Sequence, residues 1–301
     1  MAKIIDGAAM ARSIKDDIIY WANVNPKWEA RPRLDIVCTS DDPASVVYVN
    51  HKLKDCAECR IRAVAHRMQN ATTKDVLGLI DSLNANPEVD GIIVQLPGGH
   101  GLCADGILEH ISFGKDVDGL CPRNLGKLMA ARNESEVAFV PCTPKGVIHM
   151  LTHLDGNEKA SDEHIRETRS VVIGRSNIVG KPIARMLEML NSTVTVCHSG
   201  TPSIADYTKH ADIVVSATGV PGMVTGDMIK SGAIVVDVGI TRRDDGKLVG
   251  DVDCASVETV AGYITPVPGG VGPMTRAMLL KNMCIAAELR WSAAGKAIQF
   301  V

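Results

Sequence analysis

The sequence predicts an α/β protein of two domains. Helical and strand-like segments alternate along most of the chain. The strand-like segments of the second half are nearly continuous runs of Val and Ile, which is typical of parallel strands buried on both faces. With 301 residues, 46% of them hydrophobic, the chain is long enough for two domains of ordinary size. The alternation restarts near Pro141 to Gly146, where we place the junction.

The first domain is expected over residues 1–142 and the second over residues 143–274. In the first domain we expect helices over 8–22, 43–58 and 72–85 and strands over 33–39, 61–67 and 91–97. In the second we expect helices over 144–154 and 181–190, two further short helices, and strands over 170–174, 192–199, 211–218 and 232–239. A last helix begins near Thr275, and we expect residues 275–301 to complete the first domain. The polar residues 155–168 are expected to form an exposed loop or a short helix.

Composition and charge favour small-molecule partners. The net charge is −3, and no run of Lys and Arg provides a footprint for nucleic acid. No apolar stretch is long enough to cross a bilayer, and Lys3, Asp6 and Arg12 interrupt what would be the apolar core of a signal peptide. Nine scattered cysteines, an odd number, fit reduced thiols in a cytoplasmic protein better than a disulfide framework.

Two spacings that resemble metal motifs have simpler interpretations. Cys56 and Cys59 form a single C-x-x-C in an expected helix, without a second pair at zinc-finger spacing. His149 and His153 lie four apart, but the residues between them lack the glutamate of a zinc-protease helix. We therefore expect no metal site.

The segment "VVIGRSNIVGKP", Val171 to Pro182, has the order of a strand, a glycine turn and a helix start. Gly174 permits a tight turn, Ser176 offers a short polar group, and Gly180 allows close approach of the backbone to a phosphate or a neighbouring element. Because Ser176 stands where the second glycine of G-x-G-x-x-G would be, a plain glycine turn remains the alternative.

The residues after the next strand favour NADP over NAD. An NAD-dependent enzyme usually places an acid there to hold the ribose hydroxyls, but "TVTVCHSGT" contains none. Arg175 and Ser199 are instead suited to bind a 2′-phosphate through charge-assisted hydrogen bonds.

Tyr48 and Lys52, four residues apart in "YVNHK", fall on one helical face. This Tyr-x-x-x-Lys spacing also marks the catalytic pair of short-chain dehydrogenases. In that family the nucleotide loop opens the chain and the pair follows it, whereas here the pair lies far upstream of the loop. This order along the chain excludes a short-chain dehydrogenase. Taken in isolation, the pair is also consistent with a half-buried tyrosine beside a solvated lysine that has no catalytic role.

Eight segments in a fixed order carry a more specific resemblance. They are "DPASVVYVNHKLK", "DGIIVQLP", "KDVDG", "PCTPKG", "GRSNIVGKP", "TVTVCHSGT", "GDVD" and "TPVPGGVGPMT". Together they span nearly the whole chain, which closely resembles the bifunctional methylenetetrahydrofolate dehydrogenase/methenyltetrahydrofolate cyclohydrolase family.

The resemblance implies an N-terminal catalytic domain, a Rossmann-like NADP-binding domain, a folate cleft between them, and a homodimer. It implies that Lys52 is the central catalytic residue, with Tyr48, Gln95 and Asp118 around the pterin. The remaining implied contacts are Gly174, Arg175, Ser176, Ser199 and Ile240 for NADP, and Val94, Leu96, Pro268, Gly269, Gly270 and Val271 for the folate.

The implied reactions suit these residue types. NADP-dependent oxidation of 5,10-methylenetetrahydrofolate yields the methenyl cation and mainly needs alignment of the two reactants. Hydrolysis to 10-formyltetrahydrofolate needs proton transfer near neutral pH, for which burial and the cationic substrate would lower the pKa of Lys52. Gln95 would orient the lysine without adding negative charge, and Asp118 suits the donor-rich edge of a pterin. As alternatives, Gln95 caps its strand and the "DVDG" segment forms a plain turn.

Other functions stay open at this stage. They are a dehydrogenase of the same family with weak or absent cyclohydrolase activity, a non-catalytic NADP- or folate-binding sensor, and an NADP-dependent dehydrogenase for another small substrate. The chain also departs from the family pattern at three places: Gly98-Gly99-His100 after Gln95, Ser40 before the "DPAS" segment, and "CRI" after the helix of Tyr48 and Lys52. We expect these departures to change loop geometry without displacing the site residues.

Overall fold

The computed structural model describes residues 1–96, 98–99, 102–154, 160–243 and 245–293. The chain divides into two compact units built from segments that are not contiguous. Unit 1 comprises residues 1–12, 131–136 and 142–275, and unit 2 comprises residues 13–130, 137–141 and 276–301. Residues 1–12, placed in the first domain by the sequence, group with unit 1 because strand β1 (Lys3–Ile4) pairs with β11 (Tyr263–Ile264).

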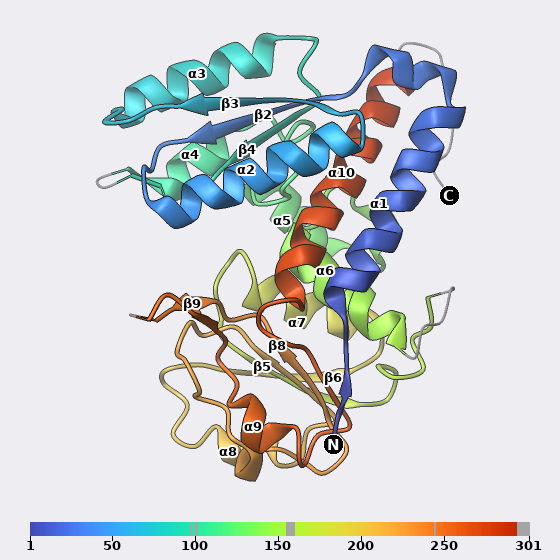
Figure 1. The fold of residues 1–301 in the computed structure, drawn as a ribbon, viewed down its shortest axis with the longest axis vertical. Helices are drawn as coiled ribbons and strands as arrows, with labels where there is room; N and C mark the ends of the chain where they lie inside the picture. The colour runs from blue at the N-terminus through green and yellow to red at the C-terminus, as the bar shows by residue number, and fades with distance from the viewer. Residues whose placement is uncertain (97, 100–101, 155–159, 244, 294–301) are drawn as a thin grey trace. The chain divides into compact units, whose positions relative to one another are not determined.

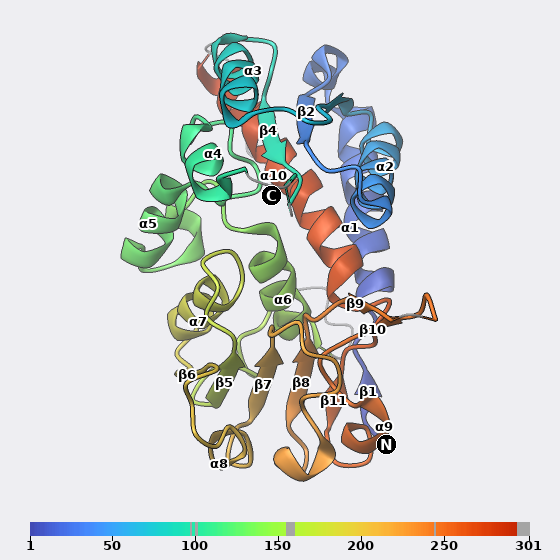
Figure 2. The same cartoon turned by 90° about the vertical axis from the view of Figure 1, so that its left-hand side faces the viewer.

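Unit 1 contains a parallel sheet in the order β1-β11-β8-β7-β5-β6, which is visible edge to edge in Figure 2. Its other strands are β5 (Arg169–Ile173), β6 (Thr193–Cys197), β7 (Ile213–Ser216) and β8 (Ile234–Asp237). The chain passes from β5 to β6 on one side and then to β7 on the other side of β5. This reversal of direction creates a switch point at the carboxyl ends of these strands, where open α/β sheets bind ligands.

The Val and Ile runs have the environment expected for them. Every residue of β7 and β8 is buried. The side chains of one sheet face join a hydrophobic core with Val224, Ile229 and Val257. The four expected strands of this unit are therefore confirmed.

The other described elements of unit 1 are helices and one small sheet. They are α6 (Cys142–Thr152), α7 (Gly180–Met189), α8 (Ala205–Thr208), α9 (Cys254–Val257), η2 (Glu134–Glu136), η4 (Gly226–Met228) and the antiparallel pair β9 (Thr241–Arg242) and β10 (Leu248–Val249).

Unit 2 contains a smaller parallel sheet in the order β3-β2-β4. Figure 1 shows α2 on one face of this sheet and α3 on the other. The expected strands and helices are confirmed as β2 (Arg33–Cys38), β3 (Arg62–Arg67), β4 (Gly91–Val94), α1 (Gly7–Val24), α2 (Pro43–Glu58) and α3 (Thr73–Ala85). Three further elements were not expected: η1 (Pro26–Ala30), α4 (Ala104–His110) and α5 (Pro122–Ala130).

The last helix, α10 (Val271–Ala293), begins four residues before the expected start at Thr275. Its C-terminal part packs within unit 2, where the rings of Trp291 and Trp28 lie 5.8 Å apart between centroids and those of Trp291 and Trp21 lie 6.1 Å apart. Asn282 donates hydrogen bonds to the carbonyls of Val117 and Val140 at 2.8 and 3.1 Å. Residues 294–301 of the expected helix, and residues 155–159 of the expected polar loop, lie outside the described residues.

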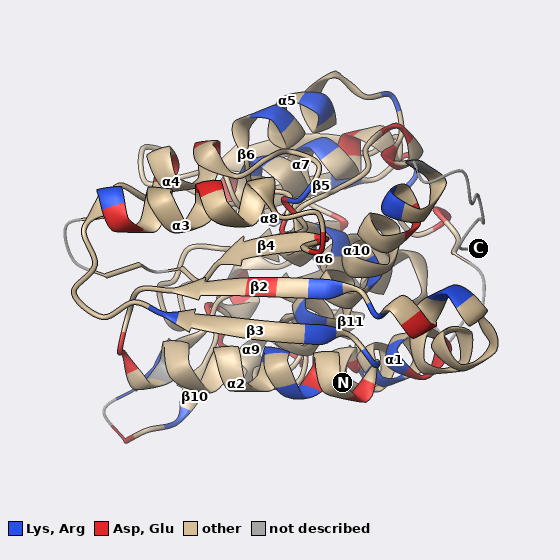
Figure 3. Ribbon diagram, turned by 90° about the horizontal axis from the view of Figure 1, so that it is seen from above, with Lys and Arg blue, Asp and Glu red and all other residues tan. Residues whose placement is uncertain are grey.

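Charged residues of both signs are interspersed along α2 and α3 (Figure 3). Local ion pairs form within and beside these helices: Lys54 pairs with Glu58 of α2 at 4.0 Å, and Arg62 of β3 pairs with Glu88, which follows α3, at 3.2 Å. Among the described helices, none is both long enough and apolar enough to span a membrane.

Candidate active site and nucleotide-binding edge

Helix α2 places Tyr48 and Lys52 on one face because its start is fixed by the sequence. The carboxylate of Asp42 accepts a hydrogen bond from the backbone N–H of Ser45 at 3.0 Å, and Pro43 occupies the first turn. Lys52 therefore follows Tyr48 by about one turn, and its Nζ lies 5.9 Å from the centre of the tyrosine ring.

Lys52 meets Gln95 in the interior of unit 2. Lys52 Nζ donates a hydrogen bond to Gln95 Oε1 at 3.0 Å, and both residues are 8% exposed. Gln95 directly follows β4, where its backbone N–H donates to the carbonyl of Val37 at 2.9 Å and its side-chain amide donates to that of Leu96 at 2.8 Å. These contacts orient the amide so that Gln95 presents its oxygen, and not its nitrogen, to the lysine at the carboxyl ends of β2 and β4.

Asp118 belongs to the same region of unit 2. Burial raises the pKa of Tyr48, the Arg276 guanidinium opposes that increase, and the Asp118 carboxylate adds to it. Both charged groups are therefore within electrostatic range of the tyrosine hydroxyl. The structure thus gathers Tyr48, Lys52, Gln95 and Asp118, all half-buried or buried.

A second aspartate, Asp116, holds the loop that carries Asp118. Its buried carboxylate accepts hydrogen bonds from the backbone of Leu120 at 3.2 Å and Cys121 at 2.8 Å and from the Asn124 side chain at 2.9 Å. Burial raises the pKa of Asp116, whereas these hydrogen bonds favour its ionised form. Sequence reasoning missed Asp116 and Asn124, because "KDVDG" offers two aspartates and does not indicate which of them is buried.

Gly119 closes that loop in a conformation available to few other residues. Its φ is +71°, and a Cβ added there would lie 2.7 Å from the backbone nitrogen of Pro141. The glycine is required both by the left-handed backbone and by the close approach.

Asp55 links three helices one turn beyond Lys52. It accepts hydrogen bonds from Lys15 of α1 at 2.8 Å and from Arg276 of α10 at 2.7 Å. The residue is 7% exposed, so these two cations compensate a buried negative charge. Sequence reasoning also missed this ion-pair cluster, since its partners are far apart in the chain.

Val94 is buried and Leu96 is half-buried on either side of Gln95. Pro97 and His100 lie outside the described residues. The Gly99 backbone N–H donates to Thr39 Oγ1 at 3.1 Å, and a Cβ on Gly99 would lie 2.7 Å from the Thr39 carbonyl oxygen. Gly99, which departs from the family pattern, therefore lies so close to the loop after β2 that a side chain at this position would collide with the Thr39 backbone.

In unit 1 the turn after β5 excludes side chains at two glycines. Gly174 has a φ of +125°, and a Cβ there would lie 2.4 Å from the carbonyl oxygen of Ala217. A Cβ on Gly180, the first residue of α7, would lie 2.1 Å from the carbonyl oxygen of Gly174. Ser176 Oγ accepts hydrogen bonds from the backbone of Val179 at 3.2 Å and of Gly180 at 3.4 Å. This compact turn before the N-terminus of a helix fits the phosphates of a dinucleotide.

Arg175 and Ser199 lie at the same edge of unit 1. Ile173 of β5 is in register with Cys197 of β6, and each of the two predicted residues follows two positions later. Both are exposed. The neighbouring parallel strands are thus followed by an arginine and a serine, and this donor set fits the 2′-phosphate of NADP. Ile240, 47% exposed, follows β8 at the carboxyl end of the same sheet.

The predicted folate loop, Pro268 to Val271, connects β11 to α10 in unit 1. The bond between Val267 and Pro268 is cis, and Gly269 has a φ of +111°. A Cβ on Gly270 would lie 2.7 Å from the carbonyl oxygen of Pro266. Backbone geometry therefore fixes these residues as a compact loop.

The two metal-like spacings form ordinary contacts. Burial raises the pKa of both Cys56 and Cys59 to about 12, which leaves the thiols protonated near neutral pH. The rings of His149 and His153 stack with centroids 3.8 Å apart. Within the described part of the chain, no group of three or more His, Cys, Asp or Glu side chains could hold a metal ion.

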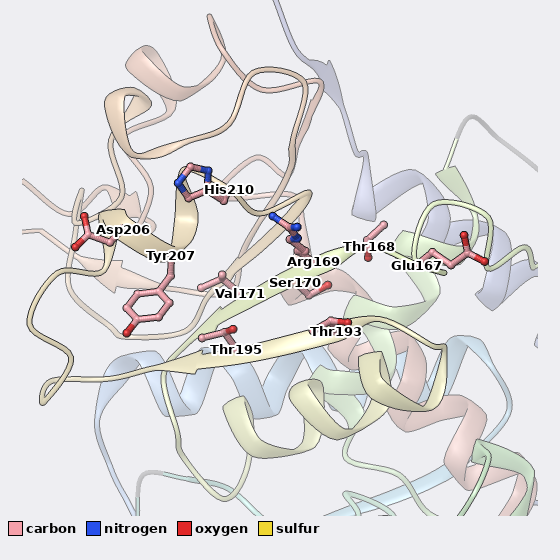
Figure 4. A pocket seen from close by; sticks show the side chains of 10 residues that line it. All are labelled: Glu167, Thr168, Arg169, Ser170, Val171, Thr193, Thr195, Asp206, Tyr207 and His210. Carbon is pink, nitrogen blue, oxygen red and sulfur yellow. The ribbon is translucent and has the colours of Figure 1, made fainter.

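A separate cavity of about 320 Å³ lies in unit 1 beside the first residues of β5 and β6. Figure 4 shows Tyr207 of α8 and Thr195 of β6 among the residues that line it. Because the lining includes the N-terminal residues Arg169 and Thr193 of these parallel strands, the cavity is distinct from the nucleotide-binding edge at their carboxyl ends.

Most of the chain is similar to known proteins. Residues 5–118 match the profile "Tetrahydrofolate dehydrogenase/cyclohydrolase, catalytic domain", and residues 141–291 match the profile of the NAD(P)-binding domain of the same family. The bifunctional protein FolD of Bordetella petrii is 46% identical over 288 residues, which cover 95% of this chain and 94% of the relative.

Two solved structures are also similar. The bifunctional FolD methylenetetrahydrofolate dehydrogenase/cyclohydrolase of Campylobacter jejuni has a TM-score of 0.89 and 42% identity, covering 96% of this chain and 100% of the other. The Trypanosoma brucei enzyme, solved with NADP cofactor and inhibitor, has a TM-score of 0.87 and 38% identity, with coverages of 96% and 98%. The chain therefore belongs to the tetrahydrofolate dehydrogenase/cyclohydrolase family and carries its catalytic and NAD(P)-binding domains in that order.

Proposed function

We propose that this protein catalyses both reactions of its family: NADP-dependent oxidation of 5,10-methylenetetrahydrofolate to 5,10-methenyltetrahydrofolate, and hydrolysis of that product to 10-formyltetrahydrofolate. The observation that carries the proposal is the buried hydrogen bond of 3.0 Å between Lys52 Nζ and Gln95 Oε1, beside Tyr48 and Asp118. A buried amine with an uncharged partner is the type of group that proton transfer in the second reaction requires.

In the first reaction NADP supplies the acceptor for the hydride that leaves the methylene carbon. The chain's contribution is to bind and orient. Asp118 accepts hydrogen bonds from the donor-rich edge of the pterin, and the Tyr48 ring packs against the ligand. The compact turn with Gly174, Arg175 and Ser176 holds the nucleotide.

In the second reaction the neutral Lys52 amine removes a proton from water as its oxygen bonds to the methenyl carbon. The resulting ammonium then gives a proton to the folate nitrogen whose bond to that carbon breaks. The regenerated amine takes the proton of the new hydroxyl group as its oxygen forms the formyl C=O. Gln95 accepts one N–H of Lys52 throughout, which fixes the direction of the lone pair without adding a negative charge. Lys52 finally releases the hydroxyl proton to solvent, which removes the positive charge of the methenyl substrate and balances protons and charge.

NADP is proposed in preference to NAD because Arg175 and Ser199 follow neighbouring strands in register, with no acid at the end of β6. The Trypanosoma brucei relative was solved with NADP. A guanidinium and a hydroxyl form charge-assisted hydrogen bonds with a phosphate, whereas NAD offers only a 2′-hydroxyl there.

We also propose that the protein is a homodimer in the cytoplasm. The dimer follows from the family resemblance. A reducing compartment suits the nine free thiols, seven of which are buried.

One assay tests the proposal. Purified protein is mixed with 5,10-methylenetetrahydrofolate and NADP or NAD in parallel, and formation of reduced cofactor and decay of the methenyl product are followed separately. The proposal predicts faster reduction with NADP and product decay faster than in buffer. Decay at the uncatalysed rate would favour a dehydrogenase without cyclohydrolase activity. Absence of turnover by well-folded protein would favour a binding sensor.

A further inference from the structure

Two carboxylates of unit 1 are buried where strands β7 and β8 end. Asp237 is the last residue of β8 and is 1% exposed. Asp251 follows β10 in the "GDVD" segment and is 0% exposed. Neither is among the residues that bind the nucleotide in the function proposed above, and both need a physical reason to remain buried.

Asp237 accepts hydrogen bonds from three backbone N–H groups. They belong to Gly239 at 2.9 Å, Asp251 at 3.0 Å and Val252 at 2.9 Å. The carboxylate thus connects the segment after β8 to the segment after β10. The carboxylate therefore fixes the position of Gly239, which directly precedes Ile240, one of the residues predicted to contact NADP.

Asp251 performs the same task for the segment after β7. Its Oδ2 accepts hydrogen bonds from the Ser216 hydroxyl at 3.1 Å and from the Thr218 backbone N–H at 2.6 Å. Its Oδ1 is buried and has no hydrogen-bond partner in the part of the chain that the structure describes. The residue before Thr218 is Ala217, whose carbonyl oxygen would lie 2.4 Å from a Cβ on Gly174 of the nucleotide turn.

The backbone around the two aspartates leaves no room for other side chains. A Cβ on Gly239 would lie 2.0 Å from Asp251 Oδ1, and a Cβ on Gly250 would lie 1.9 Å from Asp237 Oδ2. Burial raises the pKa of Asp237 to about 6, its backbone hydrogen bonds oppose this effect, and the charge of Asp251 adds to it. The pair is thus electrostatically unfavourable, yet the loops are built closely around it.

We propose that Asp237 and Asp251 are positioning residues for the nicotinamide nucleotide. Asp251 fixes the segment against which the phosphate turn packs, and Asp237 fixes the segment that leads into Ile240. Two buried carboxylates thereby set the spacing between the loops after β5, β7 and β8, which form the ligand edge of a parallel sheet. This role rests on the proposed use of NADP.

The alternative is that the pair only stabilises the fold. The two roles differ in what a substitution changes. Loss of a fold-stabilising contact lowers the melting temperature and leaves the affinity of the remaining folded protein for NADP unchanged. Loss of a positioning contact weakens NADP binding below the melting transition, with little effect on kcat at saturating NADP.

The test compares Asp251→Ala and Asp251→Asn with Asp253→Ala in the full chain. Asp253 is the matched control, because it lies in the same segment and its carboxylate caps no helix N–H. The Kd for NADP is measured by calorimetric titration, and KM and kcat are measured with the folate substrate. We expect Asp251→Ala to raise Kd and KM for NADP about tenfold with kcat within about twofold. Asp251→Asn, which retains an oxygen acceptor, should recover part of the affinity, and Asp253→Ala should match the wild type.

Unchanged Kd in folded Asp251→Ala, accompanied by a lower melting temperature, overturns the inference and assigns the pair to the fold alone. If Asp251→Ala does not fold, Ser216→Ala replaces it, because this change removes one donor and leaves the carboxylate. Weaker NADP binding by Ser216→Ala then supports the inference, and unchanged binding overturns it. If the wild-type protein does not bind NADP, the proposed function itself is refuted. The titration distinguishes this outcome from equal NADP binding by wild type and variant, which refutes only the positioning role.

Discussion

Replacing Gln95 by glutamate tests the proton-transfer role of Lys52 with one change of charge and almost no change of shape. Gln95 Oε1 is 3.0 Å from Lys52 Nζ, and both residues are 8% exposed. A unit negative charge 3.0 Å from the lysine nitrogen stabilises the ammonium by at least about 1.4 kcal/mol, the Coulomb energy at the dielectric constant of water. The Gln95→Glu change therefore favours the ammonium over the amine by an amount that corresponds to about one pH unit.

The expected result is an upward displacement of the acid limb of the cyclohydrolase rate–pH profile by about one pH unit. Near neutral pH the hydrolysis rate should fall about tenfold, because a smaller fraction of the lysine is neutral. The assay follows decay of methenyltetrahydrofolate over a range of pH, with the buffer rate subtracted. The Kd for NADP should remain unchanged, since Gln95 belongs to unit 2 and the nucleotide turn to unit 1.

Gln95→Leu is the matched control. It removes the hydrogen bond to Lys52 and the donor to the Leu96 carbonyl without adding charge. We expect a lower rate with the acid limb near its wild-type position. An acid limb that stays in place in Gln95→Glu, with hydrolysis still measurable, would refute the reasoning that Lys52 must be neutral to act.

Three other predictions follow from the site. Lys52→Met should reduce the hydrolysis rate by at least about 100-fold, the usual effect of removing a group that acts as acid or base. The Kd for NADP, measured by titration, should stay within about twofold, and equal loss of hydrolysis and NADP binding would contradict the assigned role. Arg175→Ala should raise KM for NADP by about tenfold or more and leave KM for NAD nearly unchanged, and an unaltered ratio would remove the 2′-phosphate argument. Gly119→Ala should lower the free energy of unfolding, measured in denaturant, by about 2 kcal/mol or more, because of the positive φ and the close approach to Pro141. Gly114→Ala should lower it by less than about 1 kcal/mol, because no atom lies within 4 Å of a Cβ added there.

Elements with strong local signals were predictable from sequence. The helix over residues 43–58 has its predicted bounds, because Asp42 and Pro43 together specify a helix start. Strand β1 was not predictable, since two residues carry no periodicity and Lys3–Ile4 is a strand only through pairing with β11. Helix α10 begins earlier than expected, with a glycine and a proline in its first turn, where proline needs no hydrogen-bond donor.

The sequence identified the candidate site residues in motifs but not the residues that hold them. Tyr48, Lys52 and Gln95 were assigned from ordered segments, and the structure brings them together, while their roles stay predictions for the assays above. Asp116 and Asp55 carry no such signal. Their partners come from distant helices and loops, and only the fold reveals which carboxylates are buried and which N–H groups face them.

The division of unit 2 into separated segments has a consequence for how the chain is made. Its last segment, Arg276 onward, is synthesised after the whole of residues 142–275 of unit 1. At a translation rate of about 5–20 residues per second, this delay is on the order of ten seconds. During that interval Trp28 lacks its ring partner Trp291, and the carbonyls of Val117 and Val140 lack the Asn282 amide. The nascent chain therefore lacks a ring contact and two buried hydrogen bonds of unit 2 until α10 is made, and a chain that stops before α10 lacks them permanently.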